Sequence, residues 1–108
     1  METANKIARL NDLLRKEGVG GRVMMTQGIQ TLSDETRKNV FQAIRNFDNF
    51  TTDNDPYKER DFAALTVDGE RINFKFDYYD KSMQYASDDP SDPSITERIM
   101  TVMLASEY

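Results

Sequence analysis

The sequence predicts a single α+β domain over residues 1–108, with a small three-stranded antiparallel sheet packed against about three helices. Three observations predict this class: apolar residues recur at helical spacing in separate segments, an Asp-Gly turn joins two alternating segments, and no repeat or linker divides the chain. The predicted order is α-β-α-β-β-α, so the sheet consists of one separate strand and one hairpin.

The first helix is predicted over residues 4–17, because apolar residues follow one helical face and Gly18 is a natural stop. This face consists of Ile7, Leu10, Leu13 and Leu14. The glycine-rich link that follows leads from a helix toward a strand and lacks a Gly-Lys-Ser/Thr sequence, so it does not indicate phosphate binding. Residues 22–26 then predict a short strand, although their alternation is imperfect.

The second helix is predicted to begin after Ser33, a favourable N-cap residue, with Asp34 and Glu35 in the first turn. Negative charge is favourable there because the helix dipole is positive at this end. The side chains that this helix presents to the core are Val40, Phe41, Ile44 and Phe47. The polar residues 48–59, which include Pro56, then predict a loop that leads into the hairpin.

The hairpin over residues 60–77 is the most detailed prediction. Its Asp68-Gly69 loop suits a type I′ turn, in which both central residues have positive φ. This turn determines which residues lie opposite each other on the two strands. The predicted pairs are Leu65 with Ile72, Ala63 with Phe74, Thr66 with Arg71, Ala64 with Asn73, Phe62 with Lys75 and, at the open end, Arg60 with Asp77.

The last helix is predicted to begin within two residues of Ser94, after a polar loop over residues 81–92. Two starts remain open: Asp92 as N-cap with Pro93 at the first helical position, or a capping box between Ser94 and Glu97. The predicted inward face of this helix consists of Ile95, Ile99, Met100, Val102, Met103 and Leu104.

Composition excludes several kinds of active site. The chain has no cysteine and no histidine, so disulfides, thiolate ligands, a Ser-His-Asp triad and ordinary zinc ligation cannot be built from it. No apolar run approaches the roughly 20 residues of a membrane helix, and the N-terminal residues do not resemble a secretion signal. We therefore expect a soluble cytoplasmic protein without a membrane partner.

The net charge of −5 is distributed unevenly along the chain. Residues 1–47 carry eight lysines and arginines against five acidic residues, whereas residues 48–108 carry six against fourteen. Direct nucleic-acid binding requires a concentrated basic surface, which this acidic chain does not offer. The expected partner is a basic protein surface that meets the acidic C-terminal half, because charge complementarity speeds association.

Four carboxylates in the predicted loop before the hairpin form a candidate metal site. Hard divalent cations bind several carboxylate oxygens that converge from a short segment, and the candidate ligands are Asp53, Asp55, Glu59 and Asp61. The segment is not an EF-hand, because Lys58 and Ala64 stand where such a loop needs glycine and glutamate. The alternative role of these carboxylates is to form turns around Pro56 and to pair with neighbouring basic residues.

A candidate partner-binding site lies at the end of the hairpin, at Asp77, Tyr79 and Asp80. A tyrosine beside charges is typical of interfaces, because it offers a large contact area with a polar tip. The alternative is that Tyr78 and Tyr79 only close the end of the core.

Four segments carry a resemblance to a family: Gly20-Gly21-Arg22-Val23, Asp53-Asn54-Asp55-Pro56 followed by Glu59-Arg60-Asp61-Phe62, Lys75-Phe76-Asp77-Tyr78-Tyr79-Asp80, and Met103-Leu104-Ala105-Ser106-Glu107-Tyr108. Together they resemble an uncharacterised "domain of unknown function" family of short proteobacterial, often plasmid-borne proteins, over nearly the whole chain. The resemblance implies no activity, no cofactor and no catalytic residue. It implies a role accessory to mobile-element or host-defence biology.

These observations lead to hypotheses of different classes. The leading hypothesis is a small acidic, non-catalytic interaction protein that binds a basic protein surface. The alternative is a hydrolase or nuclease that depends on Mg²⁺ or Mn²⁺, in which the four carboxylates hold the ion and Lys75 stabilises the charge that develops. A homodimer built on the outer edge of the sheet is a third hypothesis.

Overall fold

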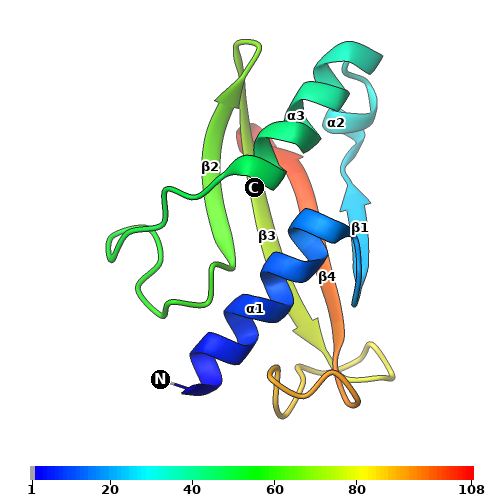
Figure 1. The fold of residues 1–108 in the computed structure, drawn as a ribbon. Helices are drawn as coiled ribbons and strands as arrows, with labels where there is room; N and C mark the ends of the chain where they lie inside the picture. Colours follow the sequence, from blue (N-terminus) through cyan, green and yellow to red (C-terminus); the bar gives the residue numbers. More distant parts are fainter. Residues whose placement is uncertain (1) are drawn as a thin grey trace.

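The computed structural model describes residues 2–108 and contains one four-stranded sheet with helices packed on one face (Figure 1). The elements in chain order are α1 (Glu2–Glu17), β1 (Arg22–Met25), α2 (Gln27–Gln30), α3 (Asp34–Asn46), β2 (Phe62–Val67), β3 (Glu70–Tyr79), β4 (Glu97–Leu104) and the 3₁₀ turn η1 (Ala105–Glu107). The two longer helices, α1 and α3, contact each other across the same face of the sheet. This arrangement confirms the predicted α+β class.

The sheet differs from the prediction in its number of strands and in the direction of one pair. Its order is β1-β4-β3-β2, with β1 parallel to β4 and the other neighbours antiparallel. The predicted three-stranded antiparallel sheet is therefore wrong in detail, because β4 is a fourth strand that lies between β1 and β3. The predicted strand at residues 22–26 exists, but it is a short strand at the edge of the sheet.

The predicted last helix is wrong, because the same residues form strand β4. Side chains alternate along this strand, and those that are buried toward the helices are Arg98, Met100 and Val102. The residues between them, Ile99 and Thr101, line a groove on the opposite face of the sheet. Apolar residues at five of the eight positions of β4 fit either a helix or a strand, and pairing with β3 along the whole of β4 decides between them.

The predicted start signals of that helix have other roles. The Asp92 carboxylate accepts hydrogen bonds from the backbone N and the Oγ of Ser94 (2.9 and 2.6 Å), which form a tight turn instead of a helix N-cap. Glu97 accepts a hydrogen bond from Lys81 Nζ (3.3 Å) and lies at the first position of β4. Asp92 and Ser94 therefore belong to the loop before β4, and Glu97 is already part of the strand.

The hairpin of β2 and β3 has the predicted register. All five predicted pairs inside the ladder are present. Both turn residues have positive φ, 51° at Asp68 and 81° at Gly69, as a type I′ turn requires. The Asp68 carboxylate also accepts a hydrogen bond from Asn39 Nδ2 of α3 (2.9 Å), so the turn is tied to the helix layer.

The pair predicted at the open end of the hairpin, between Arg60 and Asp77, is wrong. β2 begins at Phe62, and Arg60 lies outside the strand with a φ of 54°. The Arg60 guanidinium forms an ion pair with Asp12 of α1, whereas Asp77 pairs with Lys75 on its own strand. Arg60 therefore ties the preceding loop to α1 instead of closing the hairpin.

α1 ends where the sequence predicts, but it buries a different face. Gly18 follows it with a φ of 71° and donates its N–H to Leu14 O (3.0 Å). The buried side chains of α1 are Ile7, Ala8, Asn11, Leu14 and Arg15, whereas Leu13 is 40% exposed. Two polar residues therefore lie on the face that meets the sheet, in a region where the sequence predicts only apolar contacts.

α3 is the helix that the sequence describes best. Its N-cap Ser33 accepts a hydrogen bond from Thr36 N through Oγ (3.1 Å), and both Val40 and Ile44 are fully buried. The short helix α2, which the sequence analysis did not predict, precedes α3 and buries Ile29. The cluster of buried apolar side chains under the helices consists of Leu14, Ile29, Val40, Ile44, Ala63, Val67, Ile72, Phe74, Phe76, Met100 and Val102.

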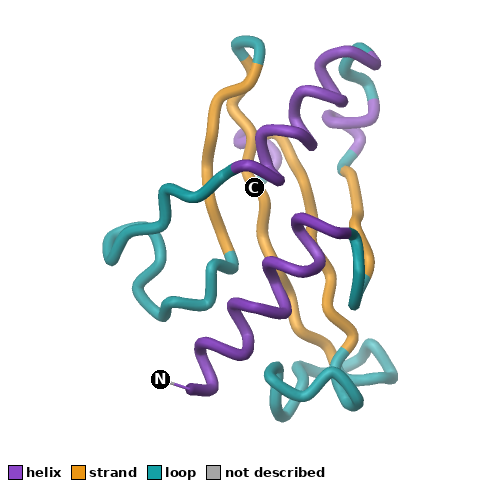
Figure 2. The backbone as a smooth tube through the Cα atoms, in the orientation of Figure 1, coloured by secondary structure: helices purple, strands orange, loops and turns teal. Residues whose placement is uncertain are grey.

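Two long loops connect these elements, over residues 48–61 and 80–96. The second loop lies at the end of the sheet that is away from the hairpin turn, whereas the first loop lies at the side of the sheet, beside β2 (Figure 2). The first loop is the one predicted before the hairpin, and the second leads from β3 into β4.

We predict that Gly21→Ala destabilises the fold by about 1–3 kcal/mol, because overpacking forces neighbouring groups apart. A Cβ at Gly21 would collide with Arg98 O and would lie 2.8 Å from Leu14 Cδ2. Urea denaturation measures the change in the free energy of unfolding. Val19→Ala in the same link is the control, because that side chain is exposed and its loss changes stability by less than about 0.5 kcal/mol. Equal stabilities of the two variants would contradict the close approach at Gly21.

Candidate functional site

Four polar side chains meet where α1 packs on β3 and β4, and we name them the Asn11 cluster: Asn11, Glu59, Tyr78 and Arg98. Asn11 and Arg98 are 0% and 1% exposed. Arg98 Nε donates to Asn11 Oδ1 (2.7 Å), and Asn11 Nδ2 donates to the Tyr78 hydroxyl (2.8 Å). The Tyr78 hydroxyl in turn donates to Glu59 Oε1 (3.1 Å). The cluster is therefore a continuous chain of hydrogen bonds from β4 to the loop before β2.

The Asn11 cluster also holds both long loops. Asn11 Nδ2 donates to Glu59 O (3.0 Å), which belongs to the loop over residues 48–61. Arg98 donates to Pro90 O, and Ser87 N donates to Tyr78 O (3.0 Å), so the loop over residues 80–96 is fastened at two points. Since one buried amide contacts both β4 and the first loop, the two loops share a single anchor.

Arg98 is buried without a carboxylate at ion-pair distance within residues 2–108. Its guanidinium lies over the ring of Tyr78, with Cζ 5.2 Å from the ring centroid, which is a favourable cation–π geometry. Burial lowers the pKa of Arg98, although an arginine remains protonated in proteins. Burial also raises the pKa of Tyr78, so its hydroxyl is a neutral hydrogen-bond donor to Glu59.

Two carboxylates near the cluster are harder to ionise than usual. Burial raises the pKa of Glu59, and the hydrogen bond from Tyr78 opposes that rise, while the charges of Asp61 and Asp55 add to it. Burial also raises the pKa of Asp61, with further contributions from the charges of Asp55 and Asp77. Glu59 and Asp61 therefore carry an electrostatic cost at neutral pH, which the fold has to offset elsewhere.

The four predicted metal-site carboxylates have separate surroundings. Asp53 is exposed, whereas Asp55 is buried and accepts a hydrogen bond from Arg60 N (3.0 Å) in a turn around Pro56. Glu59 belongs to the Asn11 cluster, and Asp61 is partly buried just before β2. Within residues 2–108 no three acidic side chains form a group that could hold a metal ion. The geometry therefore gives no support to the metal-dependent hydrolase.

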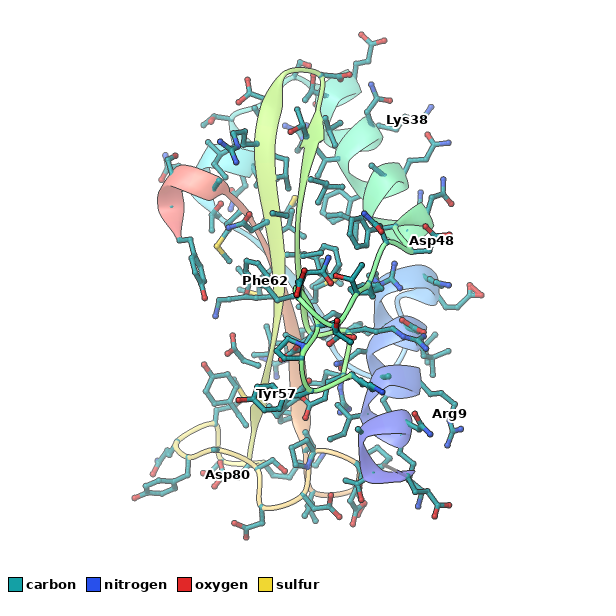
Figure 3. All side chains as sticks on the ribbon, turned by 90° about the vertical axis from the view of Figure 1, so that its left-hand side faces the viewer. Arg9, Lys38, Asp48, Tyr57, Phe62 and Asp80 are labelled. Carbon is teal, nitrogen blue, oxygen red and sulfur yellow. The ribbon has the colours of Figure 1, made fainter. Side chains whose placement is uncertain are left out.

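Two loops carry the excess negative charge of the chain, and we name them together the acidic end: residues 48–61, which begin at Asp48 near the middle of the molecule (Figure 3), and residues 80–96. The first loop carries five acidic against two basic residues, and the second carries four against one. Each loop thus has a net charge of −3, and the two together exceed the net charge of −5 of the whole chain. Figure 3 shows Tyr57 of the first loop and Asp80 of the second toward the same end.

Each acidic loop also presents one largely exposed tyrosine. Tyr57 in the first loop is 76% exposed and Tyr85 in the second is 70% exposed. Large aromatic side chains on polar loops are typical anchors of protein interfaces. The acidic end therefore combines charge with aromatic contact area.

Asp80, one of the three predicted partner-binding residues, organises the second loop. Its Oδ1 accepts hydrogen bonds from Ser82 Oγ (2.8 Å), Gln84 N (3.2 Å) and Tyr85 N (3.4 Å). These bonds, first of all the one from Ser82, lower the pKa of Asp80. Asp80 thus holds the segment that carries Tyr85.

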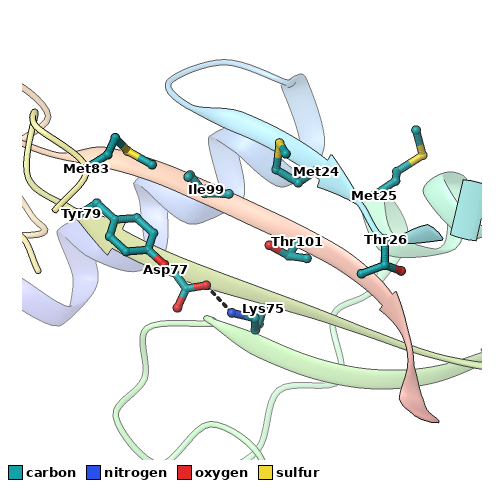
Figure 4. A pocket seen from close by; sticks show the side chains of 9 residues that line it. All are labelled: Met24, Met25, Thr26, Lys75, Asp77, Tyr79, Met83, Ile99 and Thr101. Carbon is teal, nitrogen blue, oxygen red and sulfur yellow. Dashed lines mark hydrogen bonds and ion pairs between the residues drawn. The ribbon is translucent and has the colours of Figure 1, made fainter. Parts of the chain in front are cut away.

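The other two predicted partner-binding residues, Asp77 and Tyr79, lie on the face of the sheet that the helices leave open. A groove of about 490 Å³ lies there (Figure 4), lined by nine side chains: Met24, Met25, Thr26, Lys75, Asp77, Tyr79, Met83, Ile99 and Thr101. Asp77 forms an ion pair with Lys75 on the β3 side of the groove. The structure therefore places Asp77 and Tyr79 on one surface, and Asp80 at the edge of another.

The sequence analysis did not identify Asn11 or Arg98. Asn11 lies four residues after Ile7 and four before Arg15, so helical spacing places it on the buried face. Arg98 could not be recognised, because its segment was assigned to a helix instead of a strand. In a strand, its alternation with Met100 and Val102 would have indicated burial.

The comparisons with known proteins confirm the resemblance to a family of unknown function. A profile of the family described as Protein of unknown function (DUF3768) matches residues 25–107. No curated protein and no solved structure matches the chain. The matched residues include both acidic loops, whereas α1 and its Asn11 precede them. Within residues 2–108, none of the helices has the length and apolar character needed to cross a membrane.

We predict that Asn11→Ala lowers the free energy of unfolding by about 1–3 kcal/mol, because buried Arg98 Nε loses its acceptor. The variant is also expected to increase amide hydrogen exchange in both acidic loops, since both depend on the same anchor. Asn5→Ala, at an exposed position of the same helix, is the matched control and should leave exchange unchanged. Faster exchange in neither loop would contradict the anchoring role of Asn11.

We predict that Glu59→Gln flattens the decline of stability with rising pH. Because the pKa of Glu59 is raised in the folded chain, the folded chain binds more protons than the unfolded chain at pH values above the ordinary glutamate pKa. The free energy of unfolding therefore falls as pH rises through this range. Urea midpoints between about pH 5 and about pH 7 measure this slope. The lowered pKa values of Asp80 and Glu107 act at more acidic pH, where stability falls as pH falls. Glu35→Gln, at an exposed position of α3, is the control. An unchanged slope in the Glu59 variant would contradict the prediction.

Proposed function

We propose a non-catalytic role for this chain, which belongs to the family described as Protein of unknown function (DUF3768). In this proposal it is a small interaction protein that binds a basic protein surface through its acidic end. The observation that carries the proposal is the concentration of negative charge in two loops that one buried cluster holds together.

Charge in adjacent loops acts on a partner more strongly than charge spread over a surface. At physiological ionic strength electrostatic interactions are screened beyond about 8 Å, so only neighbouring charges reinforce one another. The two loops share the Asn11 anchor, and each has a net charge of −3. The negative charge of each loop favours a basic partner, speeds its association and repels acidic surfaces.

Exposed tyrosines supply the contact area that charge alone does not. Surface ion pairs contribute little to affinity, whereas buried tyrosine side chains are frequent hot spots. Tyr57 and Tyr85 are the residues of the acidic end that we expect to be buried by the partner.

Order within the loops supports binding without a large entropic cost. Asp80 holds the segment around Tyr85, and Asp55 holds the turn before β2 through Arg60 N. A surface that is already ordered loses less conformational entropy when it binds. The hydrogen bonds inside the loops thus favour a preformed interaction surface.

The remaining parts of the proposal come from composition and family. A chain without cysteine has no need of an oxidising compartment, and this favours a cytoplasmic location. A role accessory to mobile-element or host-defence biology follows from the family resemblance alone. No feature of the described residues favours the hydrolase or nuclease over the interaction protein.

Removing three exposed charges from the acidic end tests the proposal. The combined substitutions Asp48→Asn, Asp53→Asn and Asp88→Asn change exposed side chains, and are expected to weaken binding by about tenfold at physiological salt. The tagged chain first captures its partner from lysate, and the affinity of the purified partner is then measured at rising salt.

The matched control removes three exposed charges from the helix layer, by Glu2→Gln, Glu17→Gln and Glu35→Gln. This control is expected to bind the partner with nearly unchanged affinity. A partner whose affinity depends neither on salt nor on the acidic-end substitutions would refute the proposed role of the acidic end.

A further inference from the structure

We propose that the open face of the sheet is a dimer interface, which a second copy of this chain covers with its own open face. The proposal rests on the groove and not on the acidic end, so it does not depend on the proposed function.

Exposed apolar side chains gather on this face. The helices α1 and α3 cover the opposite face, whereas η1 and Tyr108, whose ring lies 5.4 Å from that of Phe62, pack on this face at the end near the hairpin turn. Away from that end, Met24, Met25 and Met83 around the groove are 52%, 39% and 38% exposed. Ile99 lies between Met83 and Met24, and Tyr79 lies beside Met83 on β3; both are partly exposed (Figure 4). A contiguous apolar surface of this kind marks an association site, and methionine side chains adapt to irregular contacts.

The charges in the groove identify a second copy as the occupant. Lys75 and Asp77 lie on the same face of β3 and neutralise each other, so the groove selects neither a basic nor an acidic partner. In a two-fold symmetric interface, residue i contacts residue j and residue j contacts residue i. Lys75 of each copy can therefore face Asp77 of the other, which makes the groove complementary to itself.

This pairing determines how the two copies are oriented. We place the two-fold axis in the plane of the interface, over Phe76 and perpendicular to β3. Rotation about this axis brings the two β3 strands face to face and antiparallel, about 10 Å apart. The arrangement with parallel strands places Lys75 on Lys75, Asp77 on Asp77 and acidic end on acidic end, and like charges destabilise it. The antiparallel dimer instead keeps the two acidic ends at opposite ends.

A standard interface buries about 800 Å² per copy, which is about one eighth of the accessible surface of 6697 Å². The part of this face that η1 and Tyr108 leave free lies around Lys75, Asp77 and Tyr79 of β3, Ile99 and Thr101 of β4, and β1. The free edge of β1 offers less, because it has four residues and Gln30 Nε2 already donates to Met25 O (2.8 Å).

Light scattering of the purified full chain tests the proposal, with an expected mass of twice 12.5 kDa. Asp77→Lys and Lys75→Asp each place like charges across the interface, and each is expected to weaken dimerisation by at least about tenfold. An equimolar mixture of these two variants is expected to restore the dimer, because each copy then faces opposite charges. The double exchange of Lys75→Asp with Asp77→Lys in one chain is also expected to dimerise.

Glu35→Lys, at an exposed position of α3, is the control for a charge change elsewhere and should dimerise like the unsubstituted chain. An unsubstituted chain that stays monomeric at high micromolar concentration would overturn the proposal. A dimer that both single substitutions leave intact overturns it as well. The proposal would also be overturned if the chain stayed monomeric and its groove became protected from hydrogen exchange only when a different protein was bound. If a single variant fails to fold, the proposal is tested on the unsubstituted chain, by its mass in solution and by the protection of its groove from hydrogen exchange.

Discussion

The rest of the structure depends on the burial of one guanidinium group, that of Arg98. Burying a charge without a partner is costly, and here the partners are an amide oxygen, a backbone carbonyl and an aromatic face in place of a carboxylate. Asn11 supplies the amide from α1, Pro90 the carbonyl from a loop, and Tyr78 the ring from β3. Satisfying Arg98 therefore requires that a helix, a strand and a loop take one arrangement relative to each other.

This arrangement separates two surfaces with different physical properties. At the acidic end, ordered loops present negative charge and two exposed tyrosines. Electrostatic attraction from this charge acts at a distance and weakens as the salt concentration rises. On the open face of the sheet, apolar side chains surround a neutral ion pair, so association there depends on close fit and removal of water. Under the two proposals, the chain dimerises through one surface and binds a basic protein through the other.

The candidate site was only partly predictable from the sequence. The charge of residues 48–61 and 80–96 can be counted directly, and Asp77 and Tyr79 follow from the hairpin register. Asn11 and Arg98 lie 87 positions apart and meet only because α1 packs on β4. An isolated polar residue in an apolar pattern does not show which residue it pairs with. Its burial is favourable only if the fold brings a hydrogen-bond partner to it, and that partner can come from any part of the chain.

By itself the sequence determined the features that depend on neighbouring residues. These are the end of α1 at Gly18, the cap at Ser33 and the register around Asp68-Gly69, because local backbone geometry and helix capping decide them. Only the tertiary structure decided that residues 97–104 form a strand, that β1 is parallel to β4 and that Arg60 pairs with α1. The physical reason is that the apolar pattern of such a segment fits both a helix and a strand until a neighbouring strand offers it hydrogen bonds. A surface charge likewise pairs with whichever opposite charge the fold brings close to it.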